Sequence, residues 1–202
     1  MYYNTIADRT LALLKSIQSI PELSEVRLVG GTALALQIGH RVSIDLDLFG
    51  KWDHEDSLEP LLSCCGDVIL DNYQNIMQFF TIDGIKTDFV KYDYPWIGQE
   101  IKQDGIRLAS VEDIGAMKIN AIINRSTKKD FIDLAFLLKS YNLNTILDWY
   151  KTKYSSKNLA VALRSLAYFE DAEVMPMPKM IIPMKWEEAK TIVSKALRDF
   201  AS

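Results

Sequence analysis

Two aspartates stand one residue apart inside an apolar strand, and this pairing limits the folds open to the chain. Asp45 and Asp47 alternate with Ile44, Leu46 and Leu48. Side chains alternate across a strand, so both carboxylates lie on one face and the leucines on the other. Aspartate is depleted in strands, and neighbouring carboxylates repel each other unless something positive lies between them. The strand is therefore expected to face a cation.

A glycine pair precedes this strand. Residues 25–29 predict a first short strand, which runs into Gly30 and Gly31. Residues 32–38 are good helix formers, and Gly39 follows them in the position of a helix C-cap. The order is strand, glycine pair, helix and acidic strand, which predicts that the glycines and the carboxylates lie close together.

The glycine pair and Thr32 are predicted to hold phosphate. Glycines let backbone N–H groups approach a phosphate closely, and the start of a helix favours negative charge. The segment is neither a P-loop nor a dinucleotide fingerprint, because no Lys-Ser/Thr follows and the third glycine is missing. A tight turn is the simpler alternative. Ser43, on the same predicted strand face as the aspartates, could bind phosphate or a metal-bound water.

A third acidic residue occupies a later strand. Asp83-Gly84, between apolar runs, predicts a hairpin whose second arm, residues 85–90, carries Asp88. Asp83 or Asp93 could be the acidic partner instead, but only Asp88 stands in the middle of a strand.

Three strand aspartates beside a phosphate-binding turn predict a site for two metal ions. Magnesium prefers oxygen ligands, and two such ions can clamp the phosphates of a nucleotide and activate an attacking oxygen. We expect Asp45 and Asp47 to bind both ions and Asp88 one of them. The expected metal is magnesium or manganese, and the expected substrate is a nucleoside triphosphate. A solvent-facing edge strand is the alternative for the acidic pair.

Composition excludes several classes of function. Among the 202 residues, 49% are hydrophobic and 25% charged, as in an ordinary soluble protein, and no apolar run approaches the roughly 20 residues that a membrane span needs. With no signal-like start, we expect a cytoplasmic protein without a membrane partner.

Cys64 and Cys65 are adjacent, which disfavours a disulfide or a zinc site. A histidine-based mechanism would have to use His40 or His54. The net charge of −4 argues against nucleic-acid binding by the whole surface.

The helical pattern of the second half predicts two parts. Ser110 and Asp113 have the form of a capping box, which predicts a helix to about residue 124. We expect an α+β fold, with a mixed sheet in a core of residues 1–109 and a helical domain of residues 110–202 that closes the cleft. Further helices are expected at residues 6–20, 53–65, 128–140, 143–153, 156–167 and 186–200. The acidic strand is expected over residues 41–49, and further strands at 68–70 and 76–82.

The segment from Gly30 to Phe49 resembles the core motif of the nucleotidyltransferase superfamily, and more narrowly that of the AbiEii/AbiGii-type toxin nucleotidyltransferases. That pattern is a Gly-Thr-Ala-Leu run followed by Arg-x-Ser-x-Asp-x-Asp-Leu-Phe, which begins here at Arg41. The family then has an Asp-x-x-x-x-Lys helix, an arginine and a Lys-Asp-x-x-Asp run. The matching residues are Asp113, Lys118, Arg125, Lys129, Asp130 and Asp133.

The resemblance implies a polymerase-beta-like fold and transfer of a nucleoside monophosphate from a nucleoside triphosphate to an RNA end, such as that of a transfer RNA, or to a protein. It also implies the toxin half of a toxin–antitoxin or abortive-infection system, with a cognate antitoxin. The residues expected to be catalytic are Asp45, Asp47, Asp88, Lys118 and Asp130. Those expected to bind the nucleotide are Gly30, Gly31, Thr32, Arg41, Ser43, Lys118, Arg125, Lys129 and Asp133.

Several alternatives stay open. Lys118 and Arg125 stand seven apart and share a helix face, where they could stabilise phosphate charge, but a lone lysine there could also snorkel. Asp130 could belong to a capping box with Thr127. The acidic balance slightly favours a protein acceptor, whereas a local basic groove would suit RNA. The alternative function is a non-catalytic module on the same fold that senses nucleotide or binds a partner.

Overall fold

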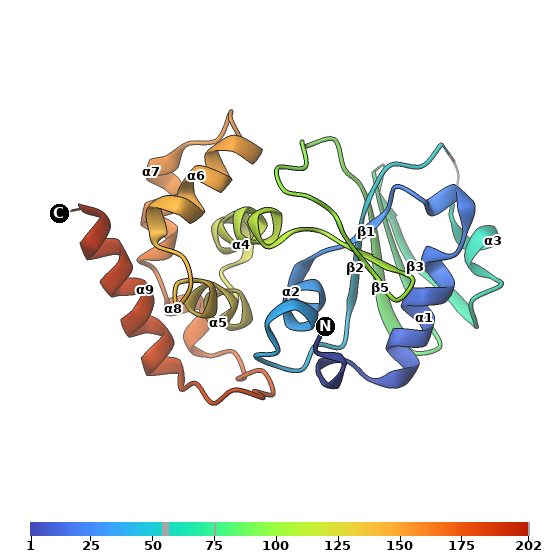
Figure 1. Ribbon diagram of the computed structural model, residues 1–202, viewed down its shortest axis with the longest axis horizontal. Coiled ribbons are helices and arrows are strands. Elements are labelled where there is room, and N and C mark those ends of the chain that lie inside the picture. The colour runs from blue at the N-terminus through green and yellow to red at the C-terminus, as the bar shows by residue number, and fades with distance from the viewer. Residues whose placement is uncertain (54–56, 75, 202) are drawn as a thin grey trace.

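The computed structural model describes residues 1–53, 57–74 and 76–201. In this part of the chain, seven strands form one mixed sheet on one side of the molecule, and most helices gather on the other side (Figure 1). The strands are β1 (Arg27–Leu28), β2 (Leu46–Gly50), β3 (Val68–Gln74), β4 (Met77–Ile82), β5 (Ile85–Lys91), β6 (Ile101–Gln103) and β7 (Ile106–Leu108).

The helices are the 3₁₀ turns η1 (Tyr3–Thr5) and η2 (Pro21–Leu23) and the α-helices α1 (Asp8–Gln18), α2 (Gly30–Ile38), α3 (Glu59–Leu62), α4 (Val111–Arg125), α5 (Lys128–Leu137), α6 (Leu143–Lys153), α7 (Leu159–Leu166), α8 (Glu170–Glu173) and α9 (Trp186–Ala201). Within the described residues, none of them combines the length and the apolar character needed to cross a membrane.

The strand order is β3-β4-β5-β2-β1-β7-β6. Strands β2 and β5 are parallel, as are β1 and β7, and the remaining neighbours are antiparallel. The predicted hairpin at Asp83-Gly84 is confirmed, and both turn residues have positive φ, as a type I′ turn requires. Asp104 and Gly105 repeat this geometry between β6 and β7. Strands β6 and β7 were not predicted, although the same dipeptide marks the turn between them.

The strand expected from Arg41 begins only at Leu46. The preceding segment is extended but hydrogen-bonds outside the sheet: the N–H of Val42 donates to the carbonyl of Lys179, and that of Ser43 to the carbonyl of Thr5. Segments near the two ends of the chain, at Thr5 and Lys179, therefore accept the backbone N–H groups that could otherwise pair with a neighbouring strand.

The helix expected over residues 53–65 is only the single turn α3 in the described residues, and residues 54–56 of that prediction lie outside them. The predicted helices α4 and α6 are confirmed. Each has a side chain that caps its start: Ser110 accepts a hydrogen bond from the N–H of Asp113, and Asn142 accepts one from the N–H of Thr145.

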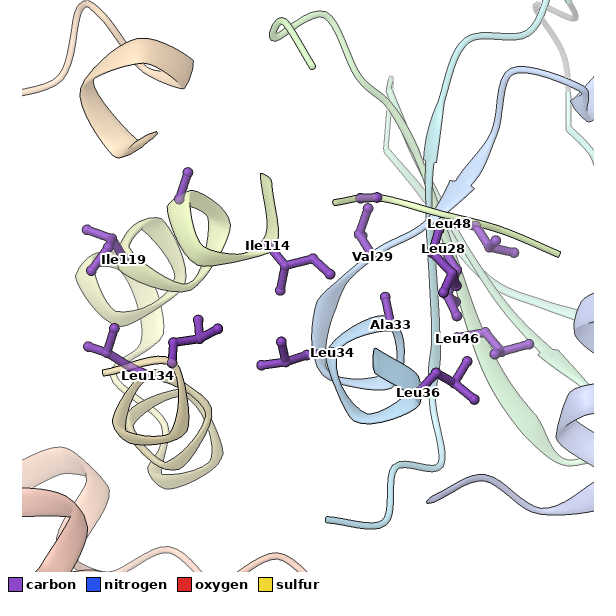
Figure 2. Close-up of a cluster of buried hydrophobic side chains, with 14 of the residues drawn as sticks. Leu28, Val29, Ala33, Leu34, Leu36, Leu46, Leu48, Ile114, Ile119 and Leu134 are labelled. Atoms are coloured by element: carbon purple, nitrogen blue, oxygen red, sulfur yellow. The ribbon is translucent and has the colours of Figure 1, made fainter. Parts of the chain in front are cut away.

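Helix α2 connects the sheet to the helical half. Figure 2 shows Leu34 pointing from α2 toward α4 and α5, while Leu36 points toward the strands. Leu28, Leu34 and Leu46 have no exposed surface and belong to one hydrophobic cluster that also contains Ile114 of α4. The core therefore continues across the link between β7 and α4, where the boundary after residue 109 was predicted.

Candidate active site

The sheet places two of the predicted carboxylates side by side. Asp47 of β2 and Asp88 of β5 are direct partners across the parallel pair. Asp45 stands just before β2, and its carboxylate is 3.7 Å from the ammonium of Lys129. Asp88 lies 3.4 Å from the Lys86 ammonium through one oxygen, and its other oxygen, Oδ1, is buried without a hydrogen-bond partner. Asp47 and Asp88 are thus neighbours across two strands, and Asp45 stands two residues before Asp47.

The pair carries charge that the protein does not fully compensate. Burial raises the pKa of Asp47, although Lys118, Arg125 and Lys129 oppose the change. Burial also raises the pKa of Asp88, with Lys86 opposing. A raised carboxylate pKa means that the ionised form is less stable than in water. A cationic ligand between the two strands would offset this cost.

The first glycine of the pair lies directly against Asp47. Gly30 has a φ of +67°, and a Cβ built on it would collide with the Asp47 carboxylate. A Cβ on Gly31 would collide with the Arg41 guanidinium. Helix α2 begins here without a side-chain cap, so its first backbone N–H groups keep their capacity to bind an anion. This geometry is compatible with the predicted phosphate contact.

Thr32 and Ser43 are buried and bonded to each other. The Thr32 hydroxyl bonds to the Ser43 hydroxyl at 2.8 Å and donates to the backbone carbonyl of Asp45. These two side chains therefore fix the segment before β2 against α2, and in this arrangement they act on Asp45 through its backbone.

Asp130 is enclosed by side chains of its own half of the molecule. It lies 2.8 Å from the Lys118 ammonium and accepts two hydrogen bonds from Arg125, at 2.8 and 3.0 Å. Thr127 donates its hydroxyl to the Asp130 carboxylate, and helix α5 has no side-chain hydrogen bond at its N-cap. The capping-box alternative for Asp130 is therefore wrong.

Asp133, one turn further along α5, joins a second set of cations. Its carboxylate is 2.6 Å from the Lys118 ammonium, accepts from Arg41 at 2.6 and 2.9 Å, and bonds to the His40 ring at 2.7 Å. His40 is buried in this network, and His54 lies outside the described residues. Lys118 is thus held between two carboxylates, which excludes the snorkelling alternative.

The two α5 carboxylates have no exposed surface. Burial alone would raise the pKa of Asp130, but Lys118 and Arg125 hold it well below the ordinary aspartate value. Lys118 and Arg41 likewise lower the pKa of Asp133 against the effect of burial. Both carboxylates are therefore ionised counterions that fix the cations in place, and neither faces open space.

A cavity of about 260 Å³ opens between the sheet and α4. Four predicted site residues line it: Gly30, Asp47, Lys118 and Arg125. Lys118 is almost completely buried, whereas 52% of the Arg125 side chain is exposed, so Arg125 is the cation with freer access. The full lining is Val29, Gly30, Asp47, Phe49, Tyr92, Tyr94, Met117, Lys118, Asn120, Ala121, Asn124, Arg125 and Tyr154.

Four other predicted residues line a second cavity, of about 460 Å³, together with the segment Met175 to Lys179. They are Arg41, Ser43, Asp45 and Lys129. Gly31, Thr32, Asp88, Asp130 and Asp133 line neither of these two cavities. The predicted site residues are therefore divided between two cavities, and the Asp45 segment lines the one beside the start of α5.

Sequence reasoning missed the aromatic and amide residues of the first cavity. Asn120 and Asn124 stand four apart on α4 and follow Lys118 closely, so the helical period could have placed them near the site. Tyr94 belongs to a segment without regular structure after β5, and Tyr154 ends α6. No local pattern connects these two tyrosines, because they meet only in the folded chain.

The donor set suits a divalent cation only in part. In the described stretches of the chain, no three acidic, histidine or cysteine side chains lie close enough together to form a metal site. Asp47 and Asp88 nevertheless supply oxygen donors from neighbouring strands, and the partnerless Asp88 oxygen is the kind of group that magnesium binds. Asp47 and Asp88 would together fit one divalent cation, and the two-ion site stays a prediction.

The family described as nucleotidyl transferase AbiEii toxin, type IV toxin–antitoxin system, matches residues 12–103 and 74–199. The chain belongs to the AbiEii nucleotidyltransferase toxin family. An uncharacterized protein of Aquifex aeolicus (strain VF5) is 31% identical over 194 residues, which are 93% of each chain. The predicted family membership is therefore confirmed.

Solved structures share the AbiEii fold. JHP933 of Helicobacter pylori has a TM-score of 0.61 at 20% identity, over 94% of this chain and 88% of its own. A candidate nucleotidyltransferase of H. pylori has a TM-score of 0.64 at 21% identity, over 94% and 90%. MenT4, a nucleotidyltransferase toxin of Mycobacterium tuberculosis H37Rv, has 0.57 at 13%, over 96% and 84%. The expected mixed-sheet nucleotidyltransferase fold is confirmed.

Proposed function

We propose that this AbiEii-family protein is a metal-dependent nucleotidyltransferase that binds a nucleoside triphosphate between the sheet and α4. The observation that carries the proposal is the pairing of Asp47 with Asp88 across β2 and β5, directly beside the Gly30 turn. In the transfer, the acceptor oxygen bonds to the α-phosphorus while the bond from that phosphorus to pyrophosphate breaks. The protein has to offset the negative charge of the phosphates throughout this exchange.

The charged side chains are arranged for that task before any substrate arrives. Lys118 and Arg125 lie near enough to Asp47 to oppose the rise of its pKa, and they are fixed by the α5 carboxylates. Fixed cations stabilise a charged transition state without the cost of reorganising. The first N–H groups of α2 and the Arg125 guanidinium would bind the phosphates. A divalent cation held by Asp47 and Asp88, with Asp45 adjoining, would neutralise phosphate charge and lower the pKa of an attacking hydroxyl.

The buried carboxylates have a positioning role in this proposal. Asp130 and Asp133 hold Lys118, Arg125 and Arg41 but have no exposed surface with which to touch the nucleotide. The proposed acceptor is an RNA end or a protein hydroxyl, in the cytoplasm. The type IV toxin–antitoxin description of the family supports the further proposal that the activity is toxic and that a cognate antitoxin opposes it.

The test is transfer of label. The protein is incubated with magnesium and each of four α-labelled nucleoside triphosphates, with total RNA and a cell lysate as acceptors. We expect label in RNA or protein with the wild type, and a loss of about 100-fold or more in Asp47→Asn and Asp88→Asn. Asp148→Asn, at an exposed aspartate of α6, is the matched control and should label normally.

The alternative is a non-catalytic module that senses nucleotide. The observation that favours it is the lack of a three-ligand acidic cluster among the described residues. Nucleotide binding by calorimetry, without label transfer to either acceptor, would support this alternative over the enzyme. Transfer that survives in both Asp47→Asn and Asp88→Asn would contradict the proposed site.

A further inference from the structure

The cavity beside Asp47 has two chemically different ends. The cations Lys118 and Arg125 lie near Gly30 and Asp47, and the remaining lining is uncharged and includes four aromatic rings. Phosphates require the cationic end, because an anion is stabilised by nearby positive charge. A nucleotide bound with its phosphates there would therefore direct its uncharged base toward the aromatic end.

The aromatic end offers one exposed ring on a rigid support. Tyr94 is 41% exposed, and its ring centroid lies 5.4 Å from that of Tyr92 and 4.7 Å from that of Tyr154. The hydroxyls of Tyr92 and Tyr154 bond to each other at 2.8 Å. Two buried tyrosines joined in this way fix the position of Tyr94. An exposed aromatic ring that is held in place is a platform on which a nucleobase can stack.

Two amide side chains, Asn120 and Asn124, lie on the α4 wall of the same cavity. Each already uses either its oxygen or its nitrogen in a hydrogen bond within the protein. The Asn120 Oδ1 accepts from the Lys157 ammonium at 2.7 Å, so its N–H₂ group is left as a donor. The Asn124 Nδ2 donates to the Asn120 backbone carbonyl at 2.8 Å, so its Oδ1 is left as an acceptor. No hydrogen bond within the described residues uses either remaining group.

We propose that Tyr94, Asn120 and Asn124 form the nucleobase subsite of the donor nucleotide. This inference rests on the proposed function. The base stacks on Tyr94, the Asn120 N–H₂ donates to an acceptor on the base edge, and the Asn124 Oδ1 accepts from a neighbouring N–H. Asn120 is half-buried and Asn124 is exposed in the free protein. A base bound over them with the wrong pattern would cover a polar group without pairing it, which disfavours that base.

The proposal predicts a change of base preference in one variant. Asn120→Asp replaces the donor with an acceptor, and Lys157 can still pair with it. Two neighbouring acceptors match guanine, whose N1–H and N2–H₂ are adjacent donors. We expect kcat/KM for the base that the wild type prefers to fall about 10- to 100-fold relative to that for GTP, as for loss of a good base contact. If the wild type already prefers GTP, its margin over the other bases should widen.

Stacking and hydrogen bonding have different signatures. Tyr94→Ala should raise KM for all four nucleotides about 10-fold or more without changing their ranking, and Tyr94→Phe should restore it, because any base can stack on a ring. Asn144→Asp, at an exposed position in the first turn of α6, is the matched control for the amide change and should leave both KM and ranking unaltered.

The subsite can be tested even without turnover. Binding of each nucleoside triphosphate and of inorganic tripolyphosphate is measured by calorimetry for the same variants. We expect Asn120→Asp to weaken binding of the other nucleoside triphosphates relative to GTP, Tyr94→Ala to weaken binding of all four, and both changes to leave tripolyphosphate binding unchanged. Binding with this pattern but no transfer by the wild type would overturn the enzymatic function and keep the subsite. Equal effects of Asn120→Asp on all four bases, or on tripolyphosphate, would overturn the subsite.

Discussion

At the scale of single residues, the site depends on a close approach that only glycine permits. Gly30 combines a left-handed backbone, with φ +67°, and contact with the Asp47 carboxylate. A side chain at this position would be strained by its backbone and would also displace Asp47. The carboxylate on β2 and the start of α2 therefore constrain each other.

We predict that Gly30→Ala lowers the transfer rate at least about 10-fold and destabilises the fold by about 1–3 kcal/mol. Gly84→Ala is the control, because Gly84 also has a positive φ, +75°, but has open space around it. Chemical denaturation and the labelling assay measure the two effects. The control should show only the backbone cost, about 1 kcal/mol, with normal transfer. Equal activity in the two variants would show that contact with Asp47 has no consequence.

At the scale of elements, helix α5 supplies counterions from one face. Asp130 and Asp133 are three apart and so share that face, and their partners come from α4 and from the segment before β2. The helix thus joins three cations through two carboxylates. Removing one partner of an ion pair buried in this way strongly destabilises the folded protein.

This arrangement predicts acid sensitivity. The folded-state pKa of Asp130 lies below the ordinary value of 3.8, so in the window beneath that value the unfolded chain binds more protons. The stabilisation is present above about pH 4 and is lost as pH falls toward the folded-state pKa. Between pH 5 and pH 3, each such carboxylate should contribute about 1 kcal/mol to the loss.

Denaturant unfolding at pH 5 and at pH 3 checks this prediction. Asp130→Asn should be less stable than the wild type at pH 5 but should lose about 1 kcal/mol less on acidification. Asp148→Asn, at an exposed carboxylate, should retain the wild-type pH dependence. An unchanged pH dependence in Asp130→Asn would contradict the assignment of a low pKa to this carboxylate.

At the scale of the whole molecule, a second buried ion pair lies within the helical half and anchors residues 95–98 of the other half through hydrogen bonds. Asp113 in the first turn of α4 is 2.7 Å from the Lys153 ammonium of α6, and both side chains are buried. Asp113 also accepts from the N–H groups of Ile97 and Gly98, at 3.0 and 3.1 Å, and Lys153 donates to the carbonyl of Pro95 at 2.8 Å. The segment that carries the aromatic wall is thus anchored to the helical half.

We predict that Lys153→Met destabilises the protein by about 3 kcal/mol, because it leaves a buried carboxylate without its cation. Lys151→Met, at a half-exposed lysine of the same helix, should cost no more than about 0.5 kcal/mol. The double variant Lys153→Met/Asp113→Asn should be less destabilised than the sum of its single changes. Strict additivity in this double-mutant cycle would show that the pair is not coupled.

Local signals explain what could be predicted of the fold. Helices α4 and α6 were predictable because Ser110 and Asn142 cap them, and the β4–β5 hairpin because Asp83-Gly84 fixes its turn. The start of β2 was not, because residues 41–45 pair with segments at both ends of the chain. The aromatic and amide wall of the cavity likewise joins residues that only the fold brings together.

The sequence by itself determined the family, most of the helices and strands, and many of the charged residues that meet, since these follow from motifs and their spacing. Only the tertiary structure decided what each carboxylate does. Asp47 and Asp130 are the same residue type in neighbouring motifs, yet burial raises the pKa of one and two cations lower the pKa of the other. Charge balance depends on which groups surround an atom in space, and that is set by packing.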